Sequence, residues 1–230
     1  MKIVTYLLLI SCVSSSYGSF DYTVSDVYLN ETLVLNSQSI LIEGGGVKNI
    51  VANGQSYIEV QNTAIDGIGK IDLYNNSNSN ISGGIVGGIG VFGVSTIKID
   101  GGTIQNIGLA VSASGLCLCD TASASISGGE IQRLNISENA TAIVSDGDIL
   151  KIASYQQSDE MKHIVFICDT SSVIYTGNTL TGKWLNGRDF TVALIDQSGY
   201  DSVYSNIQFI PEPATMLLLG VGGLWLRKRK

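Results

Sequence analysis

The fold is decided by the stretch Ser95-Thr96-Ile97-Lys98-Ile99-Asp100-Gly101-Gly102-Thr103-Ile104-Gln105-Asn106-Ile107. Ile97 and Ile99 alternate with polar residues, which is the period of a β-strand with one buried face. A glycine pair follows, and further aliphatic residues stand five and eight positions after Ile99. The stretch therefore predicts a strand, a sharp corner and a second segment that faces inward again.

The same pattern recurs six times along the chain. The first aliphatic residues of successive copies are separated by 18, 21, 18, 27 and 18 residues. The three aliphatic positions of the copies are Ile42, Val47 and Ile50; Val60, Ile65 and Ile68; Ile81, Val86 and Ile89; Ile99, Ile104 and Ile107; Ile126, Ile131 and Leu134; and Val144, Ile149 and Ile152.

Glycine pairs mark the corner in most copies. Glycine adopts positive φ without steric cost, and where the first glycine is replaced, by Asn62 or Asp146, the substitute tolerates the left-handed region better than most residues. A helix is excluded, because each glycine would destabilise it by about 1 kcal/mol.

A repeat of this length cannot bury a core alone, whereas stacked copies can. We predict an all-β chain in which residues 38–159 form a parallel β-helix, or β-solenoid, of six or seven coils. A right-handed coil is expected. The long interval predicts an extra loop around residues 108–122, and the Asn-rich run 75–80 predicts an outward turn or part of an Asn ladder.

The segments beside the repeats are expected to be caps. Residues 19–37 alternate, so they would pair with the first coil or cover its open end. Residues 160–210 contain strand-like runs and an Asn186-Gly187 hairpin signal. This segment predicts an antiparallel β cap that protects the last exposed edge. A small binding module is the alternative.

The charge of the chain argues against a nucleic-acid partner. The formal net charge is −7, and without the five basic residues near the two ends it is about −12. Proteins that bind phosphate backbones carry the opposite sign.

The N-terminal segment, residues 1–18, has the features of a signal peptide. Lys2 precedes an apolar run, and Ser16 and Gly18 place small residues at a cleavage site for signal peptidase. An alternative is lipoprotein processing, in which Cys12 would be lipidated.

The C-terminal segment combines three features. Pro211-Glu212-Pro213 precedes a mostly apolar run, residues 214–226, and the chain finishes with Arg227-Lys228-Arg229-Lys230. A helix over the apolar run would span about 20 Å, less than the roughly 30 Å of a hydrocarbon core. The basic residues would orient it with its end in the cytoplasm.

Residues 211–230 resemble the PEP-CTERM sorting domain in the order, spacing and position of these features. The resemblance implies that Pro211, Glu212 and Pro213 are recognised by exosortase, a membrane protease. It also implies a transient anchor in the inner membrane and a destination at the cell surface or in the extracellular matrix. An ordinary tail anchor is the alternative.

Residues suited to catalysis or metal binding are sparse. His163 is the only histidine, so a catalytic triad or a histidine-based metal site would have to use this residue, with no second histidine available. A structural or surface role is expected. Cys117 and Cys119 would share one strand face. We expect buried small hydrophobic residues in the core, with one disulfide to Cys168 as an alternative.

Two carboxylates offer one alternative site. Glu130 and Asp148 occupy the same repeat position in consecutive coils, about 5 Å apart, which suits a glycosidase pair or a bound cation. Asp146 lies nearby, and Arg133 is the expected local cation. A solvated acidic edge is the preferred interpretation.

From the sequence we therefore expect an exported structural or adhesive protein associated with exopolysaccharide, without catalytic residues, metal or cofactor. The alternatives are a secreted carbohydrate-active enzyme and a tail-anchored surface binding module.

Overall fold

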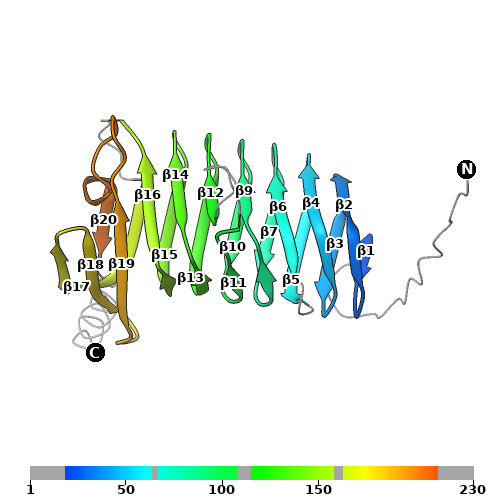
Figure 1. The fold of residues 1–230 in the computed structure, drawn as a ribbon, viewed down its shortest axis with the longest axis horizontal. Helices are drawn as coiled ribbons and strands as arrows, with labels where there is room; N and C mark the ends of the chain where they lie inside the picture. The colour runs from blue at the N-terminus through cyan, green and yellow to red at the C-terminus, as the bar shows by residue number, and fades with distance from the viewer. Residues whose placement is uncertain (1–18, 64–66, 108–114, 158–162, 212–230) are drawn as a thin grey trace, which may run out of the picture.

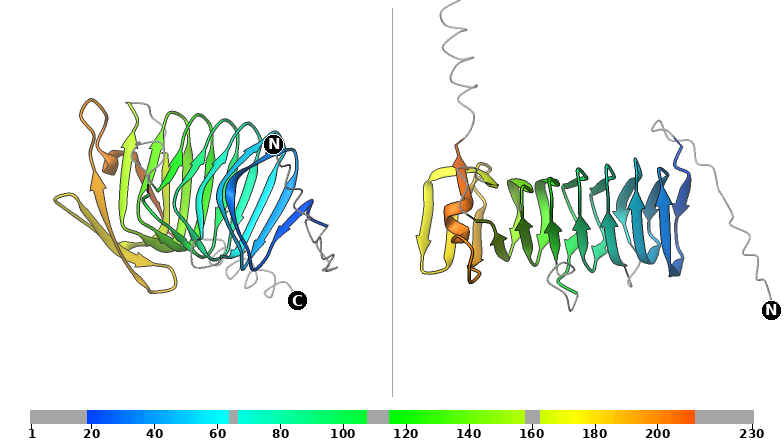
Figure 2. Two further views of the ribbon diagram at one scale, coloured as in Figure 1. Left: turned by 45° about the vertical axis from the view of Figure 1, so that its right-hand side comes forward. Right: turned by 90° about the horizontal axis from the view of Figure 1, so that it is seen from above.

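A computed structural model describes residues 19–63, 67–107, 115–157 and 163–211. These residues form an elongated parallel β-solenoid of about seven coils, whose strands stack side by side along the long axis (Figures 1 and 2). The predicted all-β, parallel solenoid is confirmed. The hand of the coil stays a prediction.

Three faces make up each coil. Face A contains β1 (Tyr22–Val24), β3 (Ser39–Glu43), β5 (Tyr57–Asn62), β7 (Asn78–Ile81), β10 (Thr96–Ile99) and the first halves of β13 (Ser123–Ile131) and β15 (Thr141–Ile149). Face B contains β8 (Ile85–Val86), β11 (Thr103–Ile104), the ends of β13 and β15, and the starts of β2 (Tyr28–Asn36), β4 (Gly46–Asn53) and β6 (Ile68–Leu73). Face C contains the ends of β2, β4 and β6 together with β9 (Ile89–Val91), β12 (Leu116–Leu118), β14 (Leu134–Ser137) and β16 (Lys151–Tyr155).

The register on face A follows the repeat. Ser39 pairs with Tyr57, Tyr57 with Asn78, Asn78 with Thr96, Thr96 with Ser123, and Ser123 with Thr141. These offsets of 18, 21, 18, 27 and 18 residues equal the spacing of the repeat. Residues 22–36 pair with β3 and β4 in the same parallel manner as the coils pair with one another.

The core consists of columns of aliphatic side chains along the rod, and each coil contributes one residue to each column. The first aliphatic positions Ile42, Val60, Ile81, Ile99, Ile126 and Val144 are each 0% exposed. Because every coil contributes the same inward positions, burial is continuous along the rod and no single coil carries a separate core.

Two predicted repeat positions are wrong, and both fall beside insertions. Ile107 is 65% exposed, and its expected place between Ile89 and Leu134 is taken by Leu116. Ile68 pairs with Val47 and Val86 and so occupies the second aliphatic position of its coil. Ile71 occupies the third, between Ile50 and Ile89. The extra residues lie at corners, because a strand cannot gain residues without turning its side chains to the other face. The predicted extra loop and Ile65 fall largely on residues outside the described ones.

The predicted positive φ is confirmed for glycines of the corner but is wrong for the two residues that replace the first glycine. Gly102 has φ +76°, but Asn62 and Asp146 do not have positive φ; in the last copy Gly147 does. In the third, fourth and fifth copies the first glycine serves close approach instead; a Cβ on Gly101 would lie 2.1 Å from the carbonyl oxygen of Ser82 in the preceding coil. In the first copy the first glycine, Gly44, has positive φ itself.

A second corner, between faces C and A, was predicted only for the Asn-rich run. In each of six successive coils, one residue at this corner has positive φ: Ser37, Gly54, Asn75, Gly93, Asp120 and Glu138. Asn75 accounts for the turn expected in the Asn-rich run, whereas Asn78 and Asn80 lie on strand β7.

The C-terminal strands pair both parallel and antiparallel with their neighbours. These strands are β17 (Ile164–Thr176), β18 (Thr179–Trp184), β19 (Asp189–Ile195) and β20 (Ile207–Ile210), with a 3-10 turn, η2 (Val203–Asn206), before β20. The pairs β17–β18 and β18–β19 are antiparallel, while β17 pairs parallel with β15 and β20, and β19 pairs parallel with β16. Phe166, Trp184, Phe190 and Phe209 pack here with ring centroids 4.5–6.0 Å apart.

Candidate functional site

The sorting segment begins where the last strand finishes. Pro211 is exposed and directly follows β20, which pairs with β17. The other expected sorting and processing residues lie outside the described residues: Glu212, Pro213 and Arg227 to Lys230 at one end, and Ser16, Gly18 and Cys12 at the other. Within residues 19–63, 67–107, 115–157 and 163–211, no helix has the length and apolar character needed to cross a membrane.

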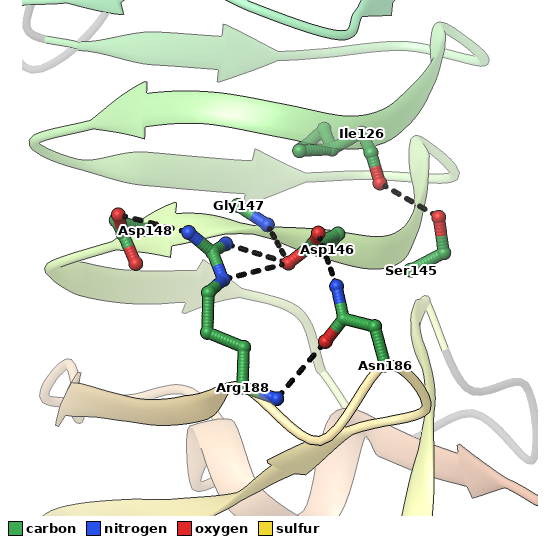
Figure 3. A network of polar contacts seen from close by, with 7 residues as sticks. All are labelled: Ile126, Ser145, Asp146, Gly147, Asp148, Asn186 and Arg188. Atoms are coloured by element: carbon green, nitrogen blue, oxygen red, sulfur yellow. Dashed lines mark hydrogen bonds and ion pairs between the residues drawn. The ribbon is translucent and has the colours of Figure 1, made fainter.

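The carboxylates Glu130 and Asp148 lie on neighbouring coils, as their repeat positions predict. The cation beside Asp148 is not Arg133, which donates to Asn135 2.8 Å away. Arg188, from the turn between β18 and β19, takes that place (Figure 3).

Arg188 and Asn186 together attach the β18–β19 turn to the solenoid (Figure 3). The Arg188 guanidinium donates to one Asp146 oxygen from Nε at 3.1 Å and Nη2 at 2.5 Å, and to Asp148 from Nη1 at 3.4 Å. Asn186 donates to the other Asp146 oxygen at 2.9 Å. Both Asp146 oxygens are therefore engaged, and the acidic edge is a docking contact for the hairpin.

Replacing Arg188 by alanine is expected to lower the free energy of unfolding by about 1–2 kcal/mol, because a charge-assisted contact to a partly buried carboxylate is lost. Urea denaturation in low and in high salt measures the free energy of unfolding of both proteins. The loss of stability caused by the substitution should be smaller in high salt. Lys183→Ala is the matched control. Its partner Asp189 is 79% exposed, so the change should stay within about 0.5 kcal/mol. Equal effects of both variants would contradict the docking role.

Cys117, Cys119 and Cys168 are free thiols. The disulfide to Cys168 that was considered as an alternative is therefore not formed between them. Among these three, Cys168 alone belongs to the main hydrophobic cluster; Cys117 is buried on the outer side of face C, where it pairs in register with Gly90 and Asn135. The expected burial is confirmed for Cys117, which is 5% exposed, whereas Cys119 is only half-buried, so the expectation is wrong for Cys119. Their Sγ atoms lie 3.7 Å apart, and the hydrogen bond from Cys117 lowers the pKa of Cys119 to about 7. Burial raises the pKa of Cys168 to about 11.

His163 is 0% exposed, and its Nδ1 lies 3.0 Å from the carbonyl oxygen of Ala140. This places the histidine in a structural contact between neighbouring coils and away from solvent.

A groove that the sequence did not single out crosses face A. It has a volume of about 570 Å³ and extends over β5, β7, β10, β13 and β15. We call it the face A groove. Two columns of outward side chains line it: Tyr57, Asn78, Thr96, Ser123 and Thr141 in the first, and Asn80, Lys98, Ser125 and Ile143 in the second.

The charged and aromatic groups at one end of the face A groove are fixed by one another. Tyr57 donates to Glu59 at 2.5 Å, and Asn80 donates to the other Glu59 oxygen at 2.9 Å. Burial, followed by the hydrogen bond to Glu59, raises the pKa of Tyr57, so its phenol stays protonated. Lys98 donates to Asp100 at 2.6 Å.

The signal for this groove is present in the repeat. Its two columns stand three positions and one position before the first aliphatic residue of each copy, as Thr96 and Lys98 do before Ile99. The pattern of inward residues is visible from the sequence alone, but the depth of an outward groove depends on how neighbouring side chains differ in size.

Comparison with known families gives one match. Residues 209–230 match the PEP-CTERM protein-sorting motif, in agreement with the resemblance found in the sequence. The matched segment begins at Phe209, inside β20, so it starts within the folded body. Neither the curated proteins nor the solved structures contain a significant match.

Proposed function

We propose that this chain, which carries a PEP-CTERM sorting motif at residues 209–230, has a structural or adhesive role in association with exopolysaccharide. The motif implies an exosortase-targeted protein of the cell surface or the extracellular space. The observation that carries the proposal is the direct junction of this motif with a β-solenoid, whose long stack presents the same kind of face over many coils.

The proposed route has two processing steps. Signal peptidase cleaves after Gly18, within the small-residue context of Ser16 and Gly18. An exosortase-like protease recognises Pro211, Glu212 and Pro213, while the short apolar helix and Arg227 to Lys230 hold the chain transiently in the inner membrane. The released body then reaches the cell surface or matrix.

We propose a non-enzymatic body. Of the two carboxylates on neighbouring coils, Asp148 is contacted by Arg188, as is the adjacent Asp146. A glycosidase requires one carboxylate free to act as acid and another as base or nucleophile. The Arg188 contact therefore favours a docking role over catalysis at Glu130 and Asp148.

The C-terminal strands support a proposed closing role. The antiparallel pairs β17–β18 and β18–β19 and the aromatic cluster around Phe166 lie where the parallel stack stops. A final layer of this kind protects unpaired strand edges from another chain. We also propose the right hand for the coil, as parallel crossovers favour.

The proposal is tested with mature protein purified from its host and with the host's own exopolysaccharide. In a pull-down, the protein should sediment with the polysaccharide and leave it undegraded. Failure to bind would contradict the exopolysaccharide association. Release of shorter glycans by the wild type, abolished by Glu130→Gln, would establish the enzyme alternative.

A further inference from the structure

The face A groove is hollow because of a local difference in side-chain size. Ser123 and Ser125 on β13 are small, whereas Tyr57 and Lys98 lie toward the N-terminal side and Ile143 toward the C-terminal side. Successive rungs of a parallel sheet lie about 4.8 Å apart, so the groove runs along the long axis of the rod across the strands. Its shape suits an extended chain more than a compact metabolite.

Unused hydroxyl groups line the middle of the groove. Among the described residues, the side-chain hydroxyls of Ser123, Ser125 and Thr141 have no hydrogen-bond partner, whereas Thr96 already donates to Asn78. Each free hydroxyl offers one donor and two acceptor positions. A ligand rich in hydroxyl groups can match this alternation of donors and acceptors.

The ends of the groove add apolar contact. The Tyr57 side chain is partly exposed and stacks against Phe20, which holds the ring in place with its centroid 6.1 Å away. Ile143 is 47% exposed at the other end. An aromatic ring and an aliphatic side chain of this kind can cover the C–H surfaces of sugar rings, which are apolar on their faces and polar at their rims.

Charge indicates which glycans fit. Lys98 is already paired with Asp100, and Glu59 accepts from Tyr57 and Asn80, so the groove offers no unpaired cation among its described lining residues. The chain without the basic residues near its two ends has a charge of about −12. A polyanionic glycan would be repelled by this field, whereas a neutral one would not.

A peptide strand is a poorer fit for the same surface. The groove lies on the face of a sheet, where the backbone groups of β7, β10 and β13 are used in ladders to neighbours on both sides. Strand addition requires an open edge with unpaired N–H and C=O groups.

We propose that the face A groove binds a neutral, hydroxyl-rich glycan chain lying along the long axis of the solenoid. The inference rests on the proposed association with exopolysaccharide and assigns the site and the chemical class of the glycan.

The test uses the mature protein as purified from its host. The host's exopolysaccharide is separated by anion exchange into a neutral and an acidic fraction. Affinity is measured by titration calorimetry. Ser125→Phe fills the groove from an exposed strand position and is expected to weaken binding of the neutral fraction at least ten-fold. Thr191→Phe is the control, because it places the same side chain at an exposed strand position on β19, outside the groove. The control should bind within two-fold of the wild type.

A second groove variant, Ser123→Phe, guards against misfolding of the first, and melting curves of all variants check the fold. Wild-type affinity in both groove variants would show that the face A groove is not the binding site, while the exopolysaccharide association would stand. Binding of the acidic fraction alone would overturn the neutral class. If the wild type binds neither fraction, the exopolysaccharide association fails, and the groove inference falls with it.

Discussion

Replacing Gly101 by alanine should lower the free energy of unfolding by about 3 kcal/mol, because the added methyl group would collide with backbone of the neighbouring coil. The new Cβ would lie 2.1 Å from the Ser82 carbonyl oxygen and 2.8 Å from its carbonyl carbon. Neither atom is the mobile end of a side chain. Relief requires the coils to separate at the corner, where Asp100 and Gly101 donate to the carbonyl of Ile81 at 3.0 and 3.3 Å.

The control is Gly177→Ala in the turn between β17 and β18. A Cβ at Gly177 would meet nothing within 4 Å, although its φ of +58° makes alanine moderately strained. This substitution should cost about 1 kcal/mol. Urea denaturation followed by circular dichroism compares the two variants with the wild type. An effect of Gly101→Ala no larger than that of Gly177→Ala would show that the corner does not depend on close approach.

The second large effect concerns sorting. Replacing Pro211, Glu212 and Pro213 together by alanine should reduce the processed fraction of the protein at least ten-fold, because the resemblance assigns recognition to these residues. The unprocessed chain should accumulate in the membrane fraction with Arg227 to Lys230 attached. Immunoblots of membrane, surface and medium fractions measure the distribution.

Gln208→Ala is the matched control for this experiment. Gln208 is exposed on β20 and stands one residue before the matched motif, so its loss alters the same neighbourhood without touching the motif. The control should be processed like the wild type. Normal processing of the triple variant would contradict the role of Pro211, Glu212 and Pro213.

Much of the solenoid could be predicted because its information is local and repeated. A strand such as Ile97-Lys98-Ile99 shows which side chains face inward, and the spacing of the copies sets the register of face A. The pairing of Glu130 with Asp148 on neighbouring coils follows from the same register. The sorting motif was also accessible, since its three parts are contiguous in the chain.

Other features depend on information that a repeat does not contain. Ile107 fits the spacing but follows β11 at an insertion, and only the pairing of Leu116 reveals that the core position lies further along the chain. The second corner is occupied by residues as different as Gly54 and Glu138, so no residue type marks it. Arg188 reaches Asp146 across 42 positions of sequence, and its contact depends on the placement of a hairpin.

The proposed sorting route is tested most directly by the intact mass of the wild-type protein isolated from its host, measured separately for each cell fraction. We expect a surface or extracellular product that lacks about 18 residues at the front and about 20 at the back, within the limits of the signal peptide and the sorting motif. A mature membrane-bound form that retains Arg227 to Lys230 would contradict exosortase processing and indicate an ordinary tail anchor.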